Sequence, residues 1–186
     1  VWQPTDPLFI SSKTVAVYRK AGGTASPNPY QRVSVVEVSA DTRLINSLLP
    51  TAEKLGQNLP ELDSVLSEMY KDAFPGGTIT TADKISAILV GADGNAENMQ
   101  RVILLGRQHT AIALCGGFAV ADKITSTGQR TYELREYDTA SGQDIGVLGR
   151  VTVDPASVLV LPAPGVPVEI PDSSAKGNLN VSMAWS

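Results

Sequence analysis

The chain contains one histidine, His109, and one cysteine, Cys115, so thiol–imidazole catalysis would have to use this pair. A nucleophile and its base must approach to about 3 Å. The six-residue spacing would separate them by ~20 Å along one strand, and on a helix they would point to opposite sides. The sequence therefore argues against cysteine catalysis and predicts that Cys115 is a buried structural residue.

Other catalytic patterns are also missing from the sequence. A serine triad would again need His109 as its base, and no Gly-x-Ser-x-Gly elbow is present. A zinc site would have to be built mainly from carboxylates, which is uncommon. The segment 93–97 (DGNAE) resembles part of a calcium loop but lacks its central glycine and distal glutamate, so it predicts a turn and a helix cap. We expect no catalytic residue, no metal and no cofactor.

Carboxylate pairs are the remaining catalytic candidates. Glu133 with Asp138, or Asp144 with Asp154, would support acid–base chemistry if the fold brought them together. Nothing in their spacing selects one pair over the other. A carboxylate-based enzyme therefore stays an alternative, although the absence of other catalytic groups favours a protein that is not an enzyme.

Composition and charge restrict the possible partners. A net charge of −4 argues against non-specific nucleic-acid binding, and neither terminus carries a basic arm. The tightest basic group, Arg19-Lys20, is interpreted as a solvated pair at a strand end. No apolar run reaches the ~18 to 20 residues of a transmembrane helix, so none is predicted.

Two strands are expected near the N-terminus, after a Pro- and Ser-containing extended arm at about 1–13. They cover 14–18 (TVAVY) and 32–38 (RVSVVEV), and a Gly- and Pro-rich loop joins them. Because the second strand is apolar on both faces, we expect it to be buried on both sides.

The middle of the chain, about 41–105, changes to a helical period. Helix N-caps are expected at Asp41, Asn58, and Thr80 or Thr81. Pro50 should end or kink the first helix, and Gly91 should end the third. Residues 95–105 fit a helix or a buried strand, and we favour the helix.

From Thr110 onward the pattern favours strands. A hairpin is expected around Gly116-Gly117, with TAIALC and FAVADKI as its two strands. Further strands are predicted at 131–138, 145–153, 157–161 and 178–185. The sequence thus predicts an α+β fold: an antiparallel or mixed β-sheet core with a helical segment at about 41–105 between N-terminal and C-terminal strands. We expect a single domain, 1–186, with extended arms at about 1–13 and 162–186.

The expected arms contain large aromatic residues that would favour contact with a neighbouring molecule. Trp2, Phe9 and Trp185 are the predicted interface residues, since an exposed aromatic on an arm is suited to docking. The alternative is that the two tryptophans fold back on their own domain. The leading hypothesis is a self-assembling structural subunit, a homo-oligomer, of which a virion coat or matrix-type shell protein is the most plausible example. Its location would then be the virion.

A second hypothesis is a small-ligand or glycan-binding module without catalysis. Tyr132 and Tyr137 lie on one predicted strand and are the candidate ligand-binding aromatics. The sequence does not decide between this hypothesis and assembly.

Overall fold

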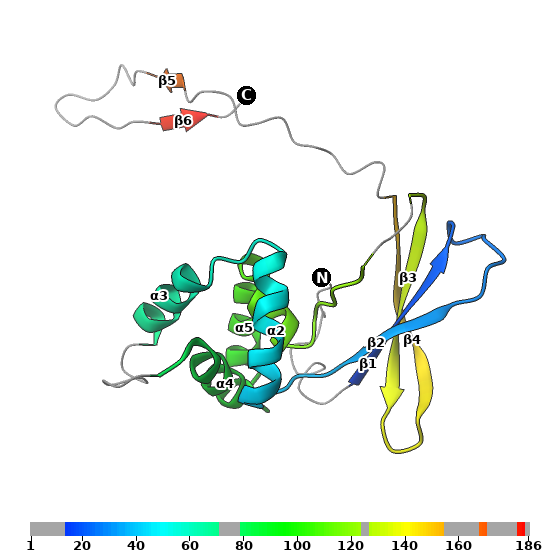
Figure 1. Cartoon of the computed structure of the whole chain (residues 1–186), viewed down its shortest axis with the longest axis horizontal. Helices are drawn as coiled ribbons and strands as arrows, with labels where there is room; N and C mark the ends of the chain where they lie inside the picture. The colour runs from blue at the N-terminus through cyan, green and yellow to red at the C-terminus, as the bar shows by residue number, and fades with distance from the viewer. Residues whose placement is uncertain (1–13, 71–78, 124–126, 155–167, 171–181, 185–186) are drawn as a thin grey trace.

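The computed structural model describes residues 14–70, 79–123, 127–154, 168–170 and 182–184. It confirms the α+β class: a four-stranded antiparallel sheet and five helices, with the helices between N-terminal and C-terminal strands. Figure 1 shows the helices gathered on one side and the sheet on the other.

The sheet combines strands from both ends of the described chain. Its members are β1 (Thr14–Ala21), β2 (Gln31–Val36), β3 (Arg130–Asp138) and β4 (Gln143–Val153). Their order is β2-β1-β3-β4, so β1 and β3 are central and β2 and β4 form the edges. Val17 of β1 lies opposite Leu134 of β3, which fixes the register across the helical insertion.

The two edges differ from the centre in burial. Val15, Ala16 and Val17 of β1 are buried, as expected for a central strand. The prediction of burial on both faces of β2 is wrong, because none of its residues is buried and Val35 is 40% exposed. Its apolar sequence was indistinguishable from that of a central strand, and only the strand order places it at an edge.

Five helices occupy the segment between β2 and β3. They are α2 (Thr42–Lys54), α3 (Leu59–Met69), α4 (Thr81–Ala92), α5 (Ala96–Gln108) and α6 (Thr110–Cys115). The predicted caps are confirmed. Asp41 accepts a hydrogen bond from the Arg43 amide at 2.8 Å, and Asn58 accepts one from the Glu61 amide at 3.1 Å.

The third cap is Thr80, which forms a reciprocal capping box with Asp83. The turn predicted at 93–97 is also present, and Asn95 caps α5 by accepting from the Asn98 amide at 3.1 Å. Residues 96–105 are helical, as favoured.

Pro50 does not end the first helix, whereas the third helix ends one residue after Gly91, close to the expected position. Pro50 lies inside α2, which continues to Lys54 and keeps Leu49 and Ala52 in the core. Gly91 lies inside α4, which ends one residue later at Ala92, itself buried. At Pro50, tertiary packing outweighs the local preference of proline to interrupt a helix.

The predicted hairpin around Gly116-Gly117 is wrong. TAIALC forms α6, and residues 118–123 are not a strand. Every α6 residue from Ala111 to Cys115 is buried, so the segment has no polar face by which its period could be recognised. The positive φ expected of a glycine is present at Gly117, where φ is +72°, and it ends the helix instead of closing a hairpin.

The helices enclose the main hydrophobic core. Ile45, Leu62, Ile85, Met99 and Ile112 each contribute a fully buried side chain from a different helix. A partly buried ion pair joins α3 to α4, because the ammonium of Lys84 lies 2.7 Å from Asp63 Oδ1 and 2.8 Å from Ser67 Oγ. The helical part therefore has its own core beside the sheet.

A second, two-stranded antiparallel sheet pairs β5 (Val168–Ile170) with β6 (Ser182–Ala184). The strand predicted at 178–185 includes β6, whereas the strand predicted at 157–161 lies outside the described residues. Within the described part of the chain, no helix has the length and apolar character required to cross a membrane.

Candidate functional site at the open edge of the sheet

The exposed strand β4 is the most unusual surface of the described residues. It pairs with β3 along one side and forms the edge of the sheet on the other. Every β4 residue except Gly149 is exposed. Eleven residues is long for a strand, so β4 presents an extended row of outward backbone groups.

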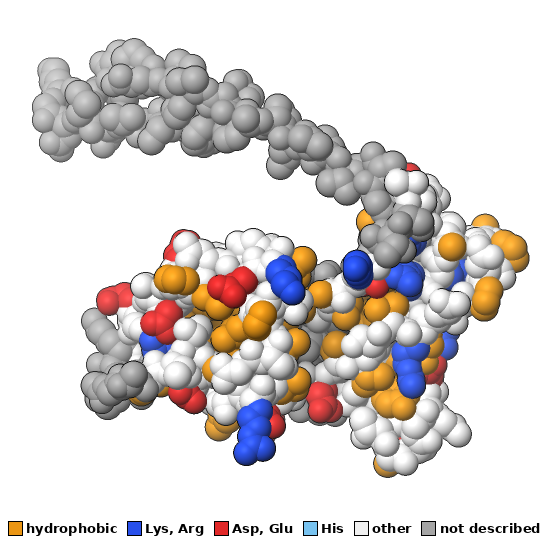
Figure 2. Space-filling model, viewed as in Figure 1, with side chains coloured by type: hydrophobic (Ala, Val, Ile, Leu, Met, Phe, Trp, Pro, Cys, Tyr) orange, Lys and Arg blue, Asp and Glu red, His pale blue; other side chains and the backbone are white. Residues whose placement is uncertain are grey.

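Apolar side chains are concentrated on this edge. Of the eleven large hydrophobic side chains that are exposed among the described residues, five are on β4. They are Ile145 (63% exposed), Val147 (50%), Leu148 (42%), Val151 (56%) and Val153 (37%). Figure 2 shows hydrophobic side chains at the surface of both the helical half and the sheet half of the molecule. An exposed apolar group of this kind indicates an interaction surface.

Two irregularities interrupt the pairing of β4 with β3. The register shifts between Leu134 and Arg135, which leaves Leu148 as the extra residue of β4. It shifts again between Glu136 and Tyr137, which leaves Ile145 extra. Bulges often protect an edge by twisting it away, but here both extra residues are apolar and exposed.

A buried carboxylate anchors β4 to β3. Glu133 is 1% exposed and its two oxygens are used separately: Oε1 accepts from Arg135 Nε at 2.6 Å, and Oε2 accepts from Arg150 Nε. Burial alone would raise the pKa of Glu133, but the bonds from Arg150 and Arg135 outweigh it and hold the pKa below its usual value. Glu133 therefore stays ionised and is suited to structure, not to proton transfer.

Arg135 extends this network toward the turn that joins β3 to β4. Its Nη1 donates to Asp144 Oδ2 at 2.7 Å, and the Tyr18 hydroxyl donates to Asp144 Oδ1 at 3.0 Å. Burial and the bond to Asp144 both raise the pKa of Tyr18. The start of β4 is thus attached to β1 as well as to β3.

Arginine–aromatic contacts complete the arrangement. The guanidinium of Arg135 lies 4.2 Å from the ring centre of Tyr18 and 5.7 Å from that of Tyr30, and Arg32 lies 5.5 Å from the Tyr137 ring. We call the whole set the arginine–tyrosine cluster; its members are Tyr18, Tyr30, Arg32, Glu133, Arg135, Tyr137, Asp144 and Arg150. It contains contributions from all four strands and the loop between β1 and β2, and it links the strands of the sheet behind its open edge.

The two tyrosines of the ligand-binding hypothesis do not form one platform. Tyr137 belongs to the arginine–tyrosine cluster, whereas the Tyr132 hydroxyl donates to Asp122 Oδ2 at 2.8 Å. Burial and this bond raise the pKa of Tyr132. Asp122 also binds Arg19, at 2.7 Å, and so ties the sheet to the segment that returns from the helices.

The interpretation of Arg19-Lys20 as a solvated pair is therefore wrong. Arg19 is bound to Asp122, and Lys20 is only 7% exposed. The Lys20 ammonium donates to the carbonyls of Thr24 and Ser26 at 2.7 and 2.8 Å and so holds the loop after β1. Neighbouring residues of a strand point to opposite faces, which explains why these two cations have separate partners.

Neither carboxylate pair converges. Glu133 and Asp138 are five residues apart on β3, which is ~16 Å, and Asp138 binds its own turn through the Ala140 amide and the Ser141 hydroxyl. Asp144 lies near the start of β4 and Asp154 directly follows its end, ~33 Å away. The geometry thus gives no support to acid–base chemistry by either pair.

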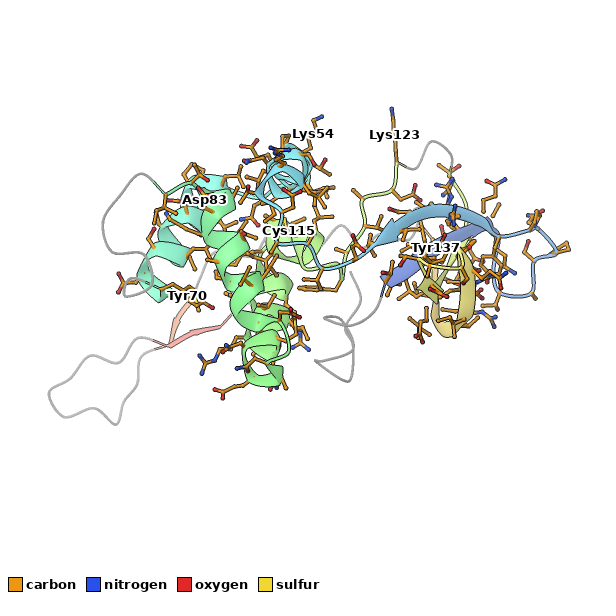
Figure 3. All side chains as sticks on the ribbon, turned by 90° about the horizontal axis from the view of Figure 1, so that it is seen from below. Lys54, Tyr70, Asp83, Cys115, Lys123 and Tyr137 are labelled. Atoms are coloured by element: carbon orange, nitrogen blue, oxygen red, sulfur yellow. The ribbon has the colours of Figure 1, made fainter. Side chains whose placement is uncertain are left out.

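His109 and Cys115 stand at opposite ends of α6, which separates them by ~9 Å along the helix axis. Cys115 is buried, as predicted, and burial raises the pKa of its thiol to about 12. Figure 3 shows Cys115 within the helical part and Tyr137 on the sheet. The predicted interface residues Trp2, Phe9 and Trp185 lie outside the described residues.

Sequence reasoning missed both the open edge and the cluster behind it. The strand itself was predicted, but its position at an edge depends on the strand order. One signal was present: Ile145, Val147, Leu148 and Val151 are apolar in a strand that has only two charged residues.

No three His, Cys, Asp or Glu residues gather as a metal site would require within the described ranges. No family model matches the chain, and no curated protein or solved structure matches it.

Proposed function

We propose that this protein is a self-assembling structural subunit, a homo-oligomer, of which a virion coat or matrix-type shell protein is the concrete form. The observation that supports the proposal is the open edge strand β4, with five exposed apolar side chains. The predicted docking residues Trp2, Phe9 and Trp185 would add contacts from the two ends of the chain.

The chemistry of β4 favours protein association over ligand binding. Proteins commonly protect an edge strand with lysine, proline, short length or a covering element. β4 has neither lysine nor proline, it is long, and no described strand pairs with its outer side. Unpaired backbone donors and acceptors together with apolar side chains are the features that another strand satisfies when it adds to a sheet.

The cluster behind β4 supports the same function. An edge that is already ordered favours strand addition, because ordering it on binding would reduce the affinity. Glu133 and Arg135 hold β4 in place through Arg150 and Asp144 before any partner arrives.

The test is the oligomeric state of the full chain, measured by light scattering after size exclusion over a range of concentrations and by electron microscopy. We expect concentration-dependent oligomers, with closed shells or sheets if the subunit is of the coat or matrix type. Val147→Lys should weaken the assembly, so that the protein concentration at which oligomers form rises at least about tenfold.

The matched control is Val90→Lys, since Val90 is 62% exposed on α4, away from the sheet. It should assemble as the native chain does. Monomers at every concentration would refute the proposal, and equal assembly of the Val147 and Val90 variants would refute the role of β4.

A further inference from the structure

We propose that two copies of this chain join β4 to β4, antiparallel and centred on Val147, so that two four-stranded sheets become one continuous sheet. This inference rests on the proposed self-assembly and specifies its contact. A second copy is the occupant because the sequence of β4 is complementary to itself when reversed about this residue.

Charge complementarity selects the register. β4 contains one acidic residue, Asp144, and one basic residue, Arg150, and they lie three positions on either side of Val147. In the proposed pairing each Asp144 stands opposite Arg150 of the second copy, twice per contact. Centring on either neighbouring residue, or on either adjacent bond, would place both charges opposite uncharged residues instead.

The groups concerned retain capacity for this second interaction. The side chain of Arg150 is 55% exposed and binds Glu133 through Nε, and a guanidinium has five N–H donors in all. Asp144 accepts from Tyr18 and Arg135, and an ionised carboxylate has about four acceptor positions. Charge pairs at an exposed edge fix register and orientation more than they add affinity.

Shape complementarity agrees with the same register. It places Ile145 opposite Gly149 and Leu148 opposite Gly146 of the second copy. A Cβ added to either glycine would meet nothing within 4 Å, so open space lies beside both. Ile145 and Leu148, the two bulge residues of β4, therefore face glycines of the second copy. The absence of a glycine side chain leaves space for them.

The contact is also closed by symmetry. An antiparallel pair of identical strands has a two-fold axis, so both copies use the same surface and the contact is complete with two molecules. Dimers formed in this way would be the units that larger assemblies use, and β2 and the chain ends would remain for further contacts.

The register can be tested by disulfide cross-linking of the full chain. Val147→Cys places the new thiol opposite its own copy, at the 4.5–5.5 Å Cα separation of antiparallel pairs, which suits a disulfide. We expect a covalent dimer under mild oxidation. Cys115 stays in place, since it is buried.

The matched control is Val151→Cys, which is exposed to a similar extent, 56% against 50%, on the same strand. In the proposed register it faces Gln143, and its own copy is ~26 Å away, so it should not cross-link alone. A mixture of Val151→Cys with Gln143→Cys should cross-link, and this second pair tests the register even if Val147→Cys misfolds.

The outcomes separate the two proposals. Cross-linking of Val147→Cys and of the mixed pair, but not of Val151→Cys alone, supports the register. Equal cross-linking of Val151→Cys alone, or none by Val147→Cys and the mixed pair in a protein that still forms oligomers, would overturn the register and leave self-assembly standing. A native chain that stays monomeric would overturn both.

Discussion

The aromatic ring of Phe118 fills the space beside the Cα of Gly106. A Cβ added to Gly106 would overlap the Cε2 and Cζ atoms of that ring, and one added to Gly116 would meet its other edge. Phe118 is 1% exposed, so its ring has no room to retreat. The two glycines therefore form a slot that admits the ring between α5 and the end of α6.

Gly106→Ala should destabilise the protein although it lies inside a helix. Alanine normally stabilises a helix interior by about 0.5–1 kcal/mol relative to glycine. Here the overlap with Phe118 should reverse the sign and cost about 1–3 kcal/mol, as other overpacked cores do. Thermal or denaturant unfolding measures the difference.

Gly91→Ala is the matched control, since Gly91 lies inside α4 with nothing within 4 Å of an added Cβ. It should stabilise by about 0.5–1 kcal/mol. A change of stability in the same direction in both variants would contradict the close packing of the Phe118 ring against Gly106.

Glu133→Gln should destabilise the sheet, because it removes the negative charge shared by Arg135 and Arg150. Loss of one partner from a fully buried ion pair costs about 3–5 kcal/mol. The Arg150 side chain is 55% exposed and water screens it, so we expect about 1–3 kcal/mol, measured by denaturant unfolding.

Glu97→Gln serves as the comparison for this variant. Glu97 and Arg101 form an i,i+4 pair on α5 whose side chains are 76% and 61% exposed. The loss should stay below about 0.5 kcal/mol. A Glu133 variant as mild as the Glu97 variant would contradict the anchoring role of Glu133.

The stability of the fold should fall in acid, and the carboxylates whose pKa values are lowered identify the pH range of the loss. Burial opposes ionisation of Glu133, but its arginines lower its pKa below 4.5, and the bond from Lys84 lowers the pKa of Asp63 below 3.8. A carboxyl whose pKa is lower in the folded state binds protons more weakly there than in the unfolded chain. Its stabilisation is therefore present above the unfolded pKa and lost as pH falls through the folded pKa.

Melting temperatures measured between about pH 7 and pH 2.5 should show this loss below about pH 4.5. In Glu133→Gln the decline should be shallower, since one of the groups no longer titrates. An unchanged slope in the variant would assign the acid sensitivity to other carboxylates.

The helices were predictable because their signals are local. Asp41, Asn58 and Thr80 each cap a helix through an amide two or three residues away, so the sequence alone contains both partners. The segment 110–115 lacks such a signal. Its residues from Ala111 to Cys115 are all buried, and only the packing of its neighbours decides between helix and strand.

The candidate site was not predictable for a related reason. The Tyr18 hydroxyl and Asp144 are 126 residues apart, and Arg32 reaches Tyr137 only through the pairing of three strands. Single residues were identified correctly, such as the buried Cys115, but the cluster depends on strand order. The alternation of residues in a strand predicts which of them share a face, but it does not predict which strand lies beside them.

The central position of β1 has a consequence for synthesis on the ribosome. Leu134, the partner of Val17, is synthesised 117 positions later (134 − 17). At a synthesis rate of about 5–20 residues per second, this delay is ~6–23 s. The helices come from one continuous stretch that emerges earlier, so they can fold while the first two strands still lack β3. A nascent chain whose helices fold as they emerge therefore has a helical core and half a sheet at this stage, with β1 still lacking its neighbour β3.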